Sequence, residues 1–292
     1  MSAGFIDRRQ VARGFSRVAA TYGDGDFLAR EIDRRMQERL DYVSLQPARI
    51  VDLGCSRGDS FAGLRARYPA AEIVGIDLVP AMLANNDPAA VGWRRWLGLA
   101  RQNGPLRLAA DAAHVPLVAG SVDLLWSNLL LHWLDDPLPA IAEAHRLLEV
   151  DGLLMFSTFG PDTLKELRAG FADGRDHTQR FIDMHDLGDM LVGCGFADPV
   201  MDMEVITLTY SDLDALFADL RAAGATCAMK SRNHGLSGRA GWAAARGAYE
   251  SLRKDGKLPA TFEVVYGHAW KVAPKKLSDG RAVIRFDRPR GG

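Results

Sequence analysis

Residues 50–58 decide the fold, and they read Ile50-Val51-Asp52-Leu53-Gly54-Cys55-Ser56-Arg57-Gly58. An apolar β-type run leads into a turn with two glycines, and a helical pattern follows directly. Glycine lets the backbone of such a turn approach a ligand closely, and the N-terminus of the next helix offers free N–H groups. The stretch predicts a strand-turn-helix unit that can bind a small molecule, although a plain βα turn has the same form.

This alternation of short apolar runs and helical patterns continues to about residue 158. The expected strands are 49–53, 72–77, 106–110, 122–127 and 153–158, and the expected helices lie near 59–67, 80–86 and 137–149. Such alternation predicts a parallel sheet covered by helices. Right-handed crossovers then bring the C-terminal ends of all these strands to one edge of the sheet, where a ligand binds.

The flanking segments complete an α/β, Rossmann-like fold. Residues 6–20 and 25–42 have the pattern of two charged amphipathic helices, which we expect to pack over the sheet edge as a cap. Residues 201–210 and 261–271 alternate like strands around a helical insertion at 211–258, which predicts a mostly parallel sheet with an antiparallel last strand. We expect a helical cap at 1–47, an α/β core at 48–160, and a C-terminal part of the same domain at 161–292.

Composition excludes several classes of protein. The chain has 292 residues, 48% of them hydrophobic and 25% charged, which is typical of a globular domain and excludes disordered and fibrous proteins. Its three cysteines are too few for a disulfide framework or a zinc site, so we expect a reducing compartment, the cytoplasm. No apolar run reaches the roughly 18 residues of a membrane span, and the charged N-terminus is unlike a signal peptide.

The net charge of −1 hides an asymmetry along the chain. Residues 221–292 hold 15 Lys and Arg against 5 Asp and Glu, whereas residues 1–220 hold 21 against 32. A basic segment of this kind indicates either a surface for an acidic partner or charges scattered over a solvated surface. A nucleic acid fits less well, since the segment has no recognised binding motif and the whole chain is not basic.

Acidic residues at the strand ends indicate the class of ligand. Asp77 ends the second strand, where a carboxylate binds ribose hydroxyls, although it could instead cap the helix that begins at Pro80. Asp111 follows the third strand and can accept a hydrogen bond from an adenine amine, with the Ala112 N–H free for a ring nitrogen. A dinucleotide would require G-x-G-x-x-G, and Ser56 replaces its second glycine. S-adenosylmethionine (SAM), an adenosine without phosphates, fits best.

These residues resemble those of class I SAM-dependent methyltransferases, from the turn at 52–58 to a Glu143-x-x-Arg146-x-Leu148 helix. More narrowly, the chain is similar to the malonyl-acyl-carrier-protein O-methyltransferases of biotin synthesis at 14–22, 126–133, 156–168 and 183–188. The resemblance implies SAM as methyl donor, no metal, and methylation of the free carboxylate of a malonyl thioester. That carboxylate is ionised at neutral pH, so no general base is required. Alignment and the removal of water are then the tasks of the enzyme.

The resemblance also implies site residues and a partner. The expected cofactor-binding residues are Asp52, Gly54, Ser56, Gly58, Asp77, Leu78, Met82, Asp111, Ala112 and Asn128. The expected substrate-positioning residues are Tyr22, His132, Trp133, Arg168 and Arg146. Acyl carrier proteins are acidic, so we expect docking on basic residues within 221–292, with no nucleic acid and no membrane as partner.

Alternative interpretations accompany several of these residues. Tyr22 could be a packing anchor, His132 could hydrogen-bond the backbone, and Arg146 could form a structural ion pair, which leaves open whether Arg146 or Arg168 holds the acceptor carboxylate. The family turn usually reads Gly-Cys-Gly-Thr-Gly, and here Ser56 and Arg57 replace its middle pair. A serine with positive φ costs roughly 1 kcal/mol, and Arg57 brings a cation near a positive sulfur, so both predict weaker SAM binding.

Two rival functions share these motifs. One belongs to a related family of mitochondrial complex I assembly proteins that hydroxylate an arginine of a partner subunit. The other is a SAM-binding assembly factor without catalytic activity, for which the Ser56-Arg57 departure is the only support. Methyl transfer to a malonyl substrate separates the leading interpretation from both.

Overall fold

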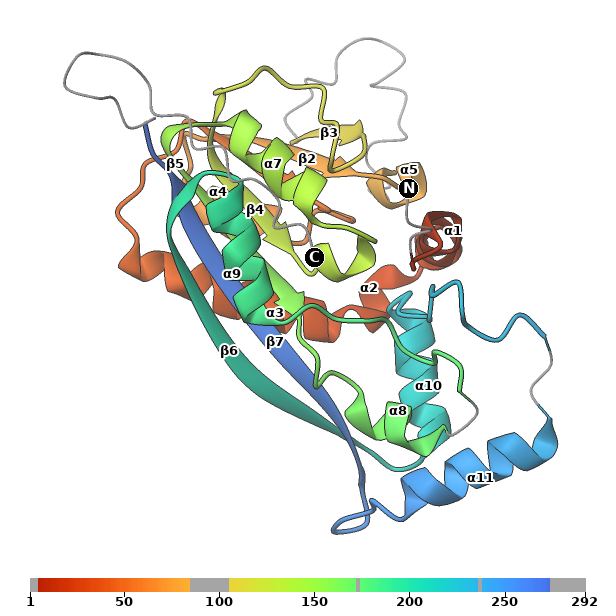
Figure 1. The fold of residues 1–292 in the computed structure, drawn as a ribbon. Helices are drawn as coiled ribbons and strands as arrows, with labels where there is room; N and C mark the ends of the chain where they lie inside the picture. The colour runs from red at the N-terminus through yellow and green to blue at the C-terminus, as the bar shows by residue number, and fades with distance from the viewer. Residues whose placement is uncertain (1–4, 85–104, 172–173, 236–237, 274–292) are drawn as a thin grey trace, which may run out of the picture.

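The computed structural model describes residues 5–84, 105–171, 174–235 and 238–273, and its centre is one seven-stranded sheet (Figure 1). The strand order is β3-β2-β1-β4-β5-β7-β6. The strands are β1 (Arg49–Leu53), β2 (Glu72–Asp77), β3 (Leu106–Ala109), β4 (Val122–Asn128), β5 (Leu148–Phe159), β6 (Phe196–Tyr210) and β7 (Leu258–Lys271). The expected fold class is confirmed, and the bounds of β1 and β2 agree with the sequence pattern to the residue.

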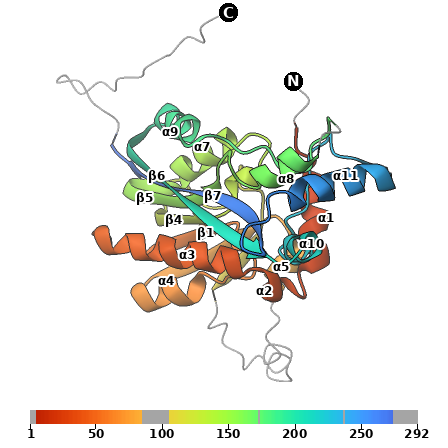
Figure 2. The ribbon, with the colours of Figure 1, turned by 90° about the horizontal axis from the view of Figure 1, so that it is seen from below.

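Helices cover both faces of the sheet. One face carries α3 (Phe27–Arg39) and α4 (Phe61–Arg67), and the other carries α7 (Leu138–Leu147) and α9 (Met184–Gly193), as Figure 2 shows. The remaining helical segments are α1 (Arg8–Val18), α2 (Tyr22–Gly25), η1 (Leu40–Tyr42), α5 (Pro80–Leu83), η3 (Leu131–Trp133), α8 (Lys165–Gly170), α10 (Leu213–Ala222) and α11 (Arg239–Glu250). No helix among the described residues is long and apolar enough to cross a membrane.

Parallel pairing of β3, β2, β1, β4 and β5 brings their C-terminal ends to one edge. The middle strands are apolar on both faces because each face is covered; Val51, Leu124 and Leu125 are fully buried. At the same edge β1 leads into the glycine turn, β2 ends at Asp77 and β4 ends at Asn128. The sheet therefore gathers the residues that the sequence pattern placed at strand ends.

The last two strands form a long hairpin that runs antiparallel to β5. β6 has 15 residues and β7 has 14, and they pair as far as Tyr210 opposite Leu258. Between these two residues the chain leaves the sheet to form α10 and α11, which lie beside the far end of the hairpin (Figure 1). The expected antiparallel strand pair with a helical insertion is confirmed.

The N-terminal helices attach to the sheet through one buried contact in particular. Ile32 and Met36 of α3 lie in the same apolar cluster as Trp126 of β4. The Trp126 Nε1–H donates a hydrogen bond of 2.9 Å to Oδ1 of Asp33. Residues 22–25, expected as a break between two helices, form the short helix α2, and α1 lies beyond it against α5.

Candidate cofactor and acceptor site

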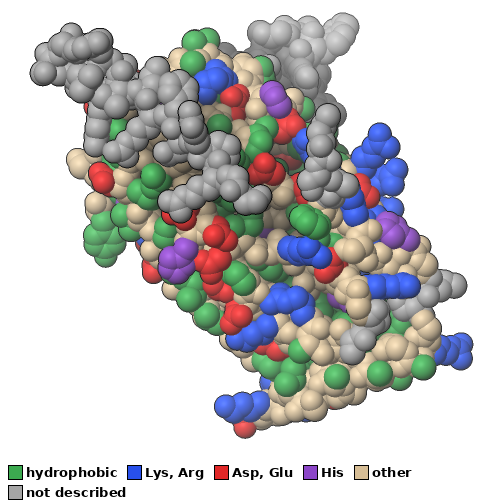
Figure 3. Space-filling model, viewed as in Figure 1, with side chains coloured by type: hydrophobic (Ala, Val, Ile, Leu, Met, Phe, Trp, Pro, Cys, Tyr) green, Lys and Arg blue, Asp and Glu red, His purple; other side chains and the backbone are tan. Residues whose placement is uncertain are grey.

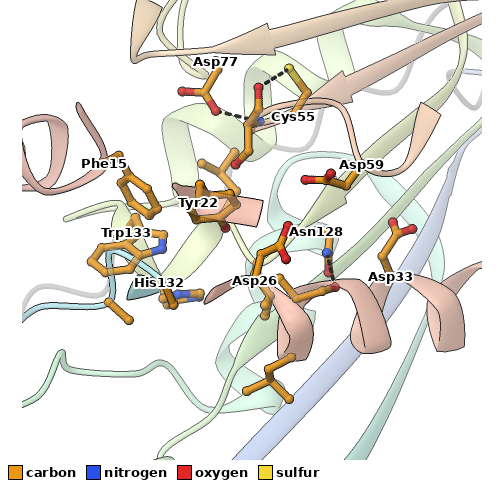
Figure 4. Close-up of a pocket in the computed structure, with 18 of the residues that line it drawn as sticks. Phe15, Tyr22, Asp26, Asp33, Cys55, Asp59, Asp77, Asn128, His132 and Trp133 are labelled. Atoms are coloured by element: carbon orange, nitrogen blue, oxygen red, sulfur yellow. Dashed lines mark hydrogen bonds between the residues drawn. The ribbon is translucent and has the colours of Figure 1, made fainter. Parts of the chain in front are cut away.

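A cavity opens at the C-terminal edge of the sheet, beneath the N-terminal helices (Figure 4). Its walls come from the glycine turn, the ends of β2 and β4, helices α1 to α3, and the insertion after β6. One end is rich in carboxylates and backbone N–H groups. The other end is lined by the rings of Phe15, Tyr22, His132, Trp133 and Phe159. The cavity thus has a polar half and an aromatic half.

The glycine turn in the polar half is held tightly against β2. The backbone N–H groups of Gly54 and Cys55 both donate to the Ile76 carbonyl oxygen, at 2.8 and 3.0 Å. Gly54 has a φ of +80°, and a Cβ there would come within 3.1 Å of Leu130. Gly58 has a φ of +86°, and a Cβ there would overlap the Phe61 ring at 2.4 Å. Both positions therefore require glycine.

Asp77 lies beside this turn on the cavity wall. Its Oδ2 accepts a hydrogen bond of 3.0 Å from the Ser56 N–H, and its Oδ1 accepts one of 2.8 Å from the Val79 N–H. An ionised carboxylate offers about four lone-pair sites, so each oxygen can still accept a ribose hydroxyl. Burial raises the pKa of Asp77, while the two backbone donors lower it. The carboxylate thus braces the turn and remains available to a nucleoside.

A second acid lies one strand further along. Asp111 follows β3, and its Oδ1 accepts the Ala113 N–H at 3.0 Å. Its Oδ2 pairs with Arg8 of α1, so the N-terminal helix reaches across the cavity edge to this position. Together with Ala112, Asp111 forms the wall next to the ribose position, where an adenine would lie. The residues present fit the adenosine part of SAM.

Eight of the ten expected cofactor-binding residues line the cavity. They are Asp52, Gly54, Ser56, Asp77, Leu78, Asp111, Ala112 and Asn128. Gly58 and Met82 are not among the lining residues; Gly58 lies against the Phe61 ring, and Met82 is buried in a cluster with Ala19, Tyr22 and Val79. Asp52 accepts a hydrogen bond from the Ser60 hydroxyl, and burial raises the pKa of Asp52 to about 8.

The two departures from the family turn differ in their placement. Ser56 has a φ of +48°, so it occupies the left-handed conformation that favours glycine. Arg57 is not among the cavity-lining residues; its guanidinium lies against Gly23, where a Cβ would come within 2.6 Å of Nη1. Its charge therefore points at the cap helix α2, and only the Ser56 departure imposes strain on the turn itself.

The aromatic half contains donors that carry no charge. His132 is buried, its Nδ1 lies 3.3 Å from Oγ1 of Thr158, and burial lowers the pKa of His132 to about 3. Burial also raises the pKa of Tyr22 to about 12, with a hydrogen bond to Ser56 opposing the shift. The Phe15 and Trp133 rings meet edge to face with centroids 5.1 Å apart. Near neutral pH this half offers neutral N–H and O–H groups among apolar rings.

The structure brings neither of the two candidate arginines to the cavity. Arg146 donates to both carboxylate oxygens of Glu143, at 2.7 and 2.8 Å, and to the carbonyls of Val115 and Leu117. It therefore fastens the segment after β3, in keeping with the structural ion pair considered for it. Arg168 donates to the carbonyls of Thr163 and Pro161, so it closes the turn that precedes its own helix.

Several residues on the cavity wall had no signal in the sequence. Asp26, Arg30 and Asp33 belong to α3 or to the residue before it, and they line the cavity together with Phe15 and Phe159. Phe15 and Phe159 lie within the segments that carry the family resemblance. The three charged residues look like the polar face of a surface helix. In the folded chain Asp26 and Asp33 are buried, whereas Arg30 stays half exposed at the edge of the cavity.

Asp33 gives the folding equilibrium a pH dependence that can be measured. Burial raises the pKa of Asp33 to about 6, with hydrogen bonds from Trp126 and Gln37 opposing the shift. The stability contributed by protonation is fully present below the unfolded-state pKa of about 4 and is lost as the pH rises through 6. We expect the free energy of unfolding of the wild type, relative to Asp33→Asn, to fall by about 2 kcal/mol between pH 4 and pH 7.

Urea unfolding of both proteins across this pH range measures the difference. Asp186→Asn, at an exposed position on α9, serves as the control and should leave the pH profile of the wild type unchanged. Parallel profiles for wild type and Asp33→Asn would contradict the raised pKa.

Comparison with known proteins agrees with this geometry. A family model described as "Methyltransferase domain" matches residues 51–156, which include the end of β1, the turn and β2. Two solved structures share the fold. The YcgJ protein of Bacillus subtilis has a TM-score of 0.52 and 15% sequence identity, and the match covers 82% of this chain and 99% of that one. The [4+2]-cyclase SpnF has a TM-score of 0.51 and 23% sequence identity, and the match covers 82% of each chain. At such identities the likeness concerns the fold alone.

Two curated relatives are much more similar. The malonyl-[acyl-carrier protein] O-methyltransferase of Gallionella capsiferriformans is 48% identical over 98% of each chain. The protein of the same name from Laribacter hongkongensis is 49% identical over 97% of each chain. The chain therefore belongs to the malonyl-[acyl-carrier protein] O-methyltransferase family and is a SAM-dependent methyltransferase.

Proposed function

We propose that this enzyme transfers the methyl group of SAM to the free carboxylate of a malonyl thioester carried by acyl carrier protein, which would begin the pimeloyl chain of biotin. The observation that carries the proposal is a cavity whose polar half, which fits a nucleoside, continues into an aromatic half. In addition, the chain is 48% and 49% identical to two relatives whose names state this reaction. We place the reaction in the cytoplasm, in keeping with the free thiols of Cys55, Cys194 and Cys227.

The residues of the aromatic half suit an acceptor that is already ionised. SAM supplies a methyl group on a positively charged sulfur. The Tyr22 hydroxyl and the neutral His132 ring can hold a carboxylate by hydrogen bonds alone. An ion pair with a cation would instead reduce the nucleophilicity of the carboxylate. The surrounding rings of Phe15, Trp133 and Phe159 exclude water from the reacting oxygen. Orientation and desolvation are therefore the contributions of the chain itself.

The reaction is tested with isotope-labelled SAM and three acceptors: malonyl-acyl carrier protein, malonyl-CoA and free malonate. Mass spectrometry should find one added methyl group on the malonyl carboxylate of the carrier-bound substrate. Transfer to none of the three acceptors would overturn the proposal. Oxygen added to a protein arginine would favour the hydroxylase alternative, and SAM binding without turnover would favour the non-catalytic one.

Carrier docking is supported by a basic surface beside the cavity. Arg9, Arg13 and Arg17 follow one another at four-residue spacing along α1, and all three are exposed. Lys230 is also exposed, and its backbone N–H donates to the carbonyl of Phe5, just before α1. Arg8, Val11 and Phe15 of the same helix line the cavity, whereas Arg9, Arg13 and Arg17 lie on the opposite, solvent-exposed face of α1. These three arginines and Lys230 are here called the α1 basic surface. Figure 3 shows Lys and Arg side chains projecting at the right-hand edge over α1.

Many of the other basic residues of the C-terminal quarter are less suited to this role. Arg246 pairs with Asp214, Arg253 with Glu250 and Arg232 with Asp7. Lys254 and Lys257 pair across the tight turn that directly precedes β7, here called the hairpin tip, and β7 begins at the lower end of the molecule, away from α1 (Figure 1). Lys275, Lys276, Arg281 and Arg285 lie outside the described residues. We therefore propose the α1 basic surface as the docking site in place of the expected segment 221–292, to which only Lys230 of these four residues belongs.

Charge reversal at Arg9, Arg13 and Arg17 is expected to lower kcat/KM for malonyl-acyl carrier protein at least about tenfold at low salt, because it reverses the attraction that steers an acidic carrier. The loss should shrink as salt rises, and kcat/KM for malonyl-CoA should change far less. Lys254→Glu/Lys257→Glu is the matched control at the hairpin tip. A loss confined to that control would place the carrier at the hairpin instead.

A further inference from the structure

One carboxylate on the cavity wall is buried without a hydrogen-bond donor. Asp26, the residue between α2 and α3, is 2% exposed, and within the described part of the chain neither of its side-chain oxygens accepts a hydrogen bond. Arg30, which is half exposed, forms an ion pair with Oδ1 through Nη1, and the same nitrogen donates a hydrogen bond of 3.0 Å to the Gly23 carbonyl. Oδ2 has no hydrogen-bond partner among the described residues. Figure 4 shows Asp26 between Tyr22 and Asn128 at the cavity.

Such an arrangement costs stability in the ligand-free protein. A buried carboxylate that is not hydrogen-bonded loses its hydration without replacement, and buried polar groups in folded proteins are otherwise almost always paired. Burial and the nearby Asp59 raise the pKa of Asp26 to about 6, while Arg30 opposes the shift. At neutral pH most Asp26 side chains are still ionised, so the cavity presents a buried carboxylate whose ion-pair partner within the described residues is the half-exposed Arg30.

The sheet order fixes which part of SAM would meet this charge. Asp77 stands at the end of β2 and Asp111 beyond β3, so the adenosine part occupies that side of the glycine turn. The rest of the molecule must extend across the end of β1 toward β4, where Asn128 and Asp26 lie (Figure 4). This remaining part is a methionine with an α-ammonium group, a carboxylate and the sulfonium.

Other side chains near that position are less suited to the ammonium. The Asn128 amide nitrogen donates to the Ala29 carbonyl at 2.9 Å, and its Oδ1 accepts from the Ser157 hydroxyl at 2.6 Å. Asp33 already accepts hydrogen bonds from Trp126 and Gln37. Asp59 lines the cavity but is exposed, so water solvates it. Of Asp26, Asp33 and Asp59, only Asp26 combines burial with side-chain oxygens that accept no hydrogen bond within the described residues.

We propose that Asp26 binds the α-ammonium group of the methionyl part of SAM. An ammonium brings three N–H donors, which would hydrogen-bond the unpartnered Oδ2 of Asp26 and add a second positive charge beside this carboxylate. The bond would orient the methionyl chain, and with it the methyl group, relative to the aromatic half. This inference concerns donor binding only, so it does not depend on which acceptor the enzyme uses.

Calorimetric titration with two ligands tests the proposal. S-adenosylhomocysteine carries the ammonium, whereas its deaminated analogue keeps the adenosine, the sulfur and the carboxylate but lacks it. We expect the wild type to bind the deaminated analogue at least about tenfold more weakly, as for the loss of a charge-assisted hydrogen bond. In Asp26→Asn the two Kd values should lie within about threefold of each other, because the carboxylate that distinguishes the ligands is gone.

Asp24→Asn, on the exposed side of α2, is the matched control and should keep the full difference between the ligands. Asp26→Asn should melt no lower than the wild type, since it removes a buried charge. A wild type that binds both ligands equally well would overturn the proposal, and this measurement requires no variant to fold. An undiminished difference in Asp26→Asn would overturn it as well. Neither result bears on methyl transfer to malonyl-acyl carrier protein, so the two proposals fail separately.

Discussion

Asp77→Ala is expected to abolish the thermal stabilisation that S-adenosylhomocysteine gives the enzyme. The carboxylate holds the turn through the N–H groups of Ser56 and Val79 and presents its free lone pairs at the ribose position. Its removal takes away both functions, so we expect Kd to rise at least about 100-fold, or about 3 kcal/mol. Thermal shift at a fixed ligand concentration gives the first readout and calorimetry gives Kd.

Asp77→Asn separates the two functions of this side chain. The amide keeps one oxygen acceptor and the size of the side chain, so its loss of affinity should be smaller than that of alanine. Leu106→Ala, at an exposed position on β3, is a control that should leave binding unchanged. A thermal shift that persists in Asp77→Ala would mean that the ribose lies elsewhere.

Trp126→Ala is expected to lower the free energy of unfolding by about 4 kcal/mol. The indole is fully buried at the centre of the sheet, and its Nε1–H is a donor to the buried Asp33 carboxylate. The substitution leaves a cavity and removes a hydrogen bond from a buried charge, and both effects act in the same direction. Urea unfolding of the wild type and the variant measures the change.

Trp126→Phe distinguishes packing from the hydrogen bond. It keeps most of the ring volume and removes only the donor, so we expect a loss of about 1–3 kcal/mol at neutral pH and less at pH 4, where Asp33 is protonated. A loss below 1 kcal/mol for Trp126→Ala would contradict the view that this side chain fastens α3 to the sheet.

The elements that repeat a simple pattern could be predicted from the sequence. The strands β1 and β2 are short apolar runs bounded by turn residues, and Asp77 and Asp111 follow such runs directly. Their meeting at one sheet edge follows from parallel pairing and crossover handedness. For this reason most of the nucleoside half of the cavity could be expected without coordinates.

Residues placed by tertiary packing could not be predicted in this way. Asp26 lies in a Gly-Asp sequence that resembles a linker, and its burial arises only when α2 and α3 close over the turn. Arg146 and Arg168 look like anion-binding groups in the sequence, yet backbone carbonyls and Glu143 occupy their donors in the folded chain. Charge type alone does not reveal whether a side chain has a partner inside the protein.

The sheet fixes both ends of the insertion between β6 and β7. Its two ends return to paired residues, Tyr210 and Leu258, so its length and sequence can change while the register of the sheet stays the same. Leu220, Ala223 and Ala225 of this segment contribute to the cavity wall, whereas the glycine turn and Asp77 belong to the other half of the chain. Exchange of residues 211–257 between relatives would alter the choice of acceptor while the donor site is retained, which makes this segment the natural unit for grafting new specificities.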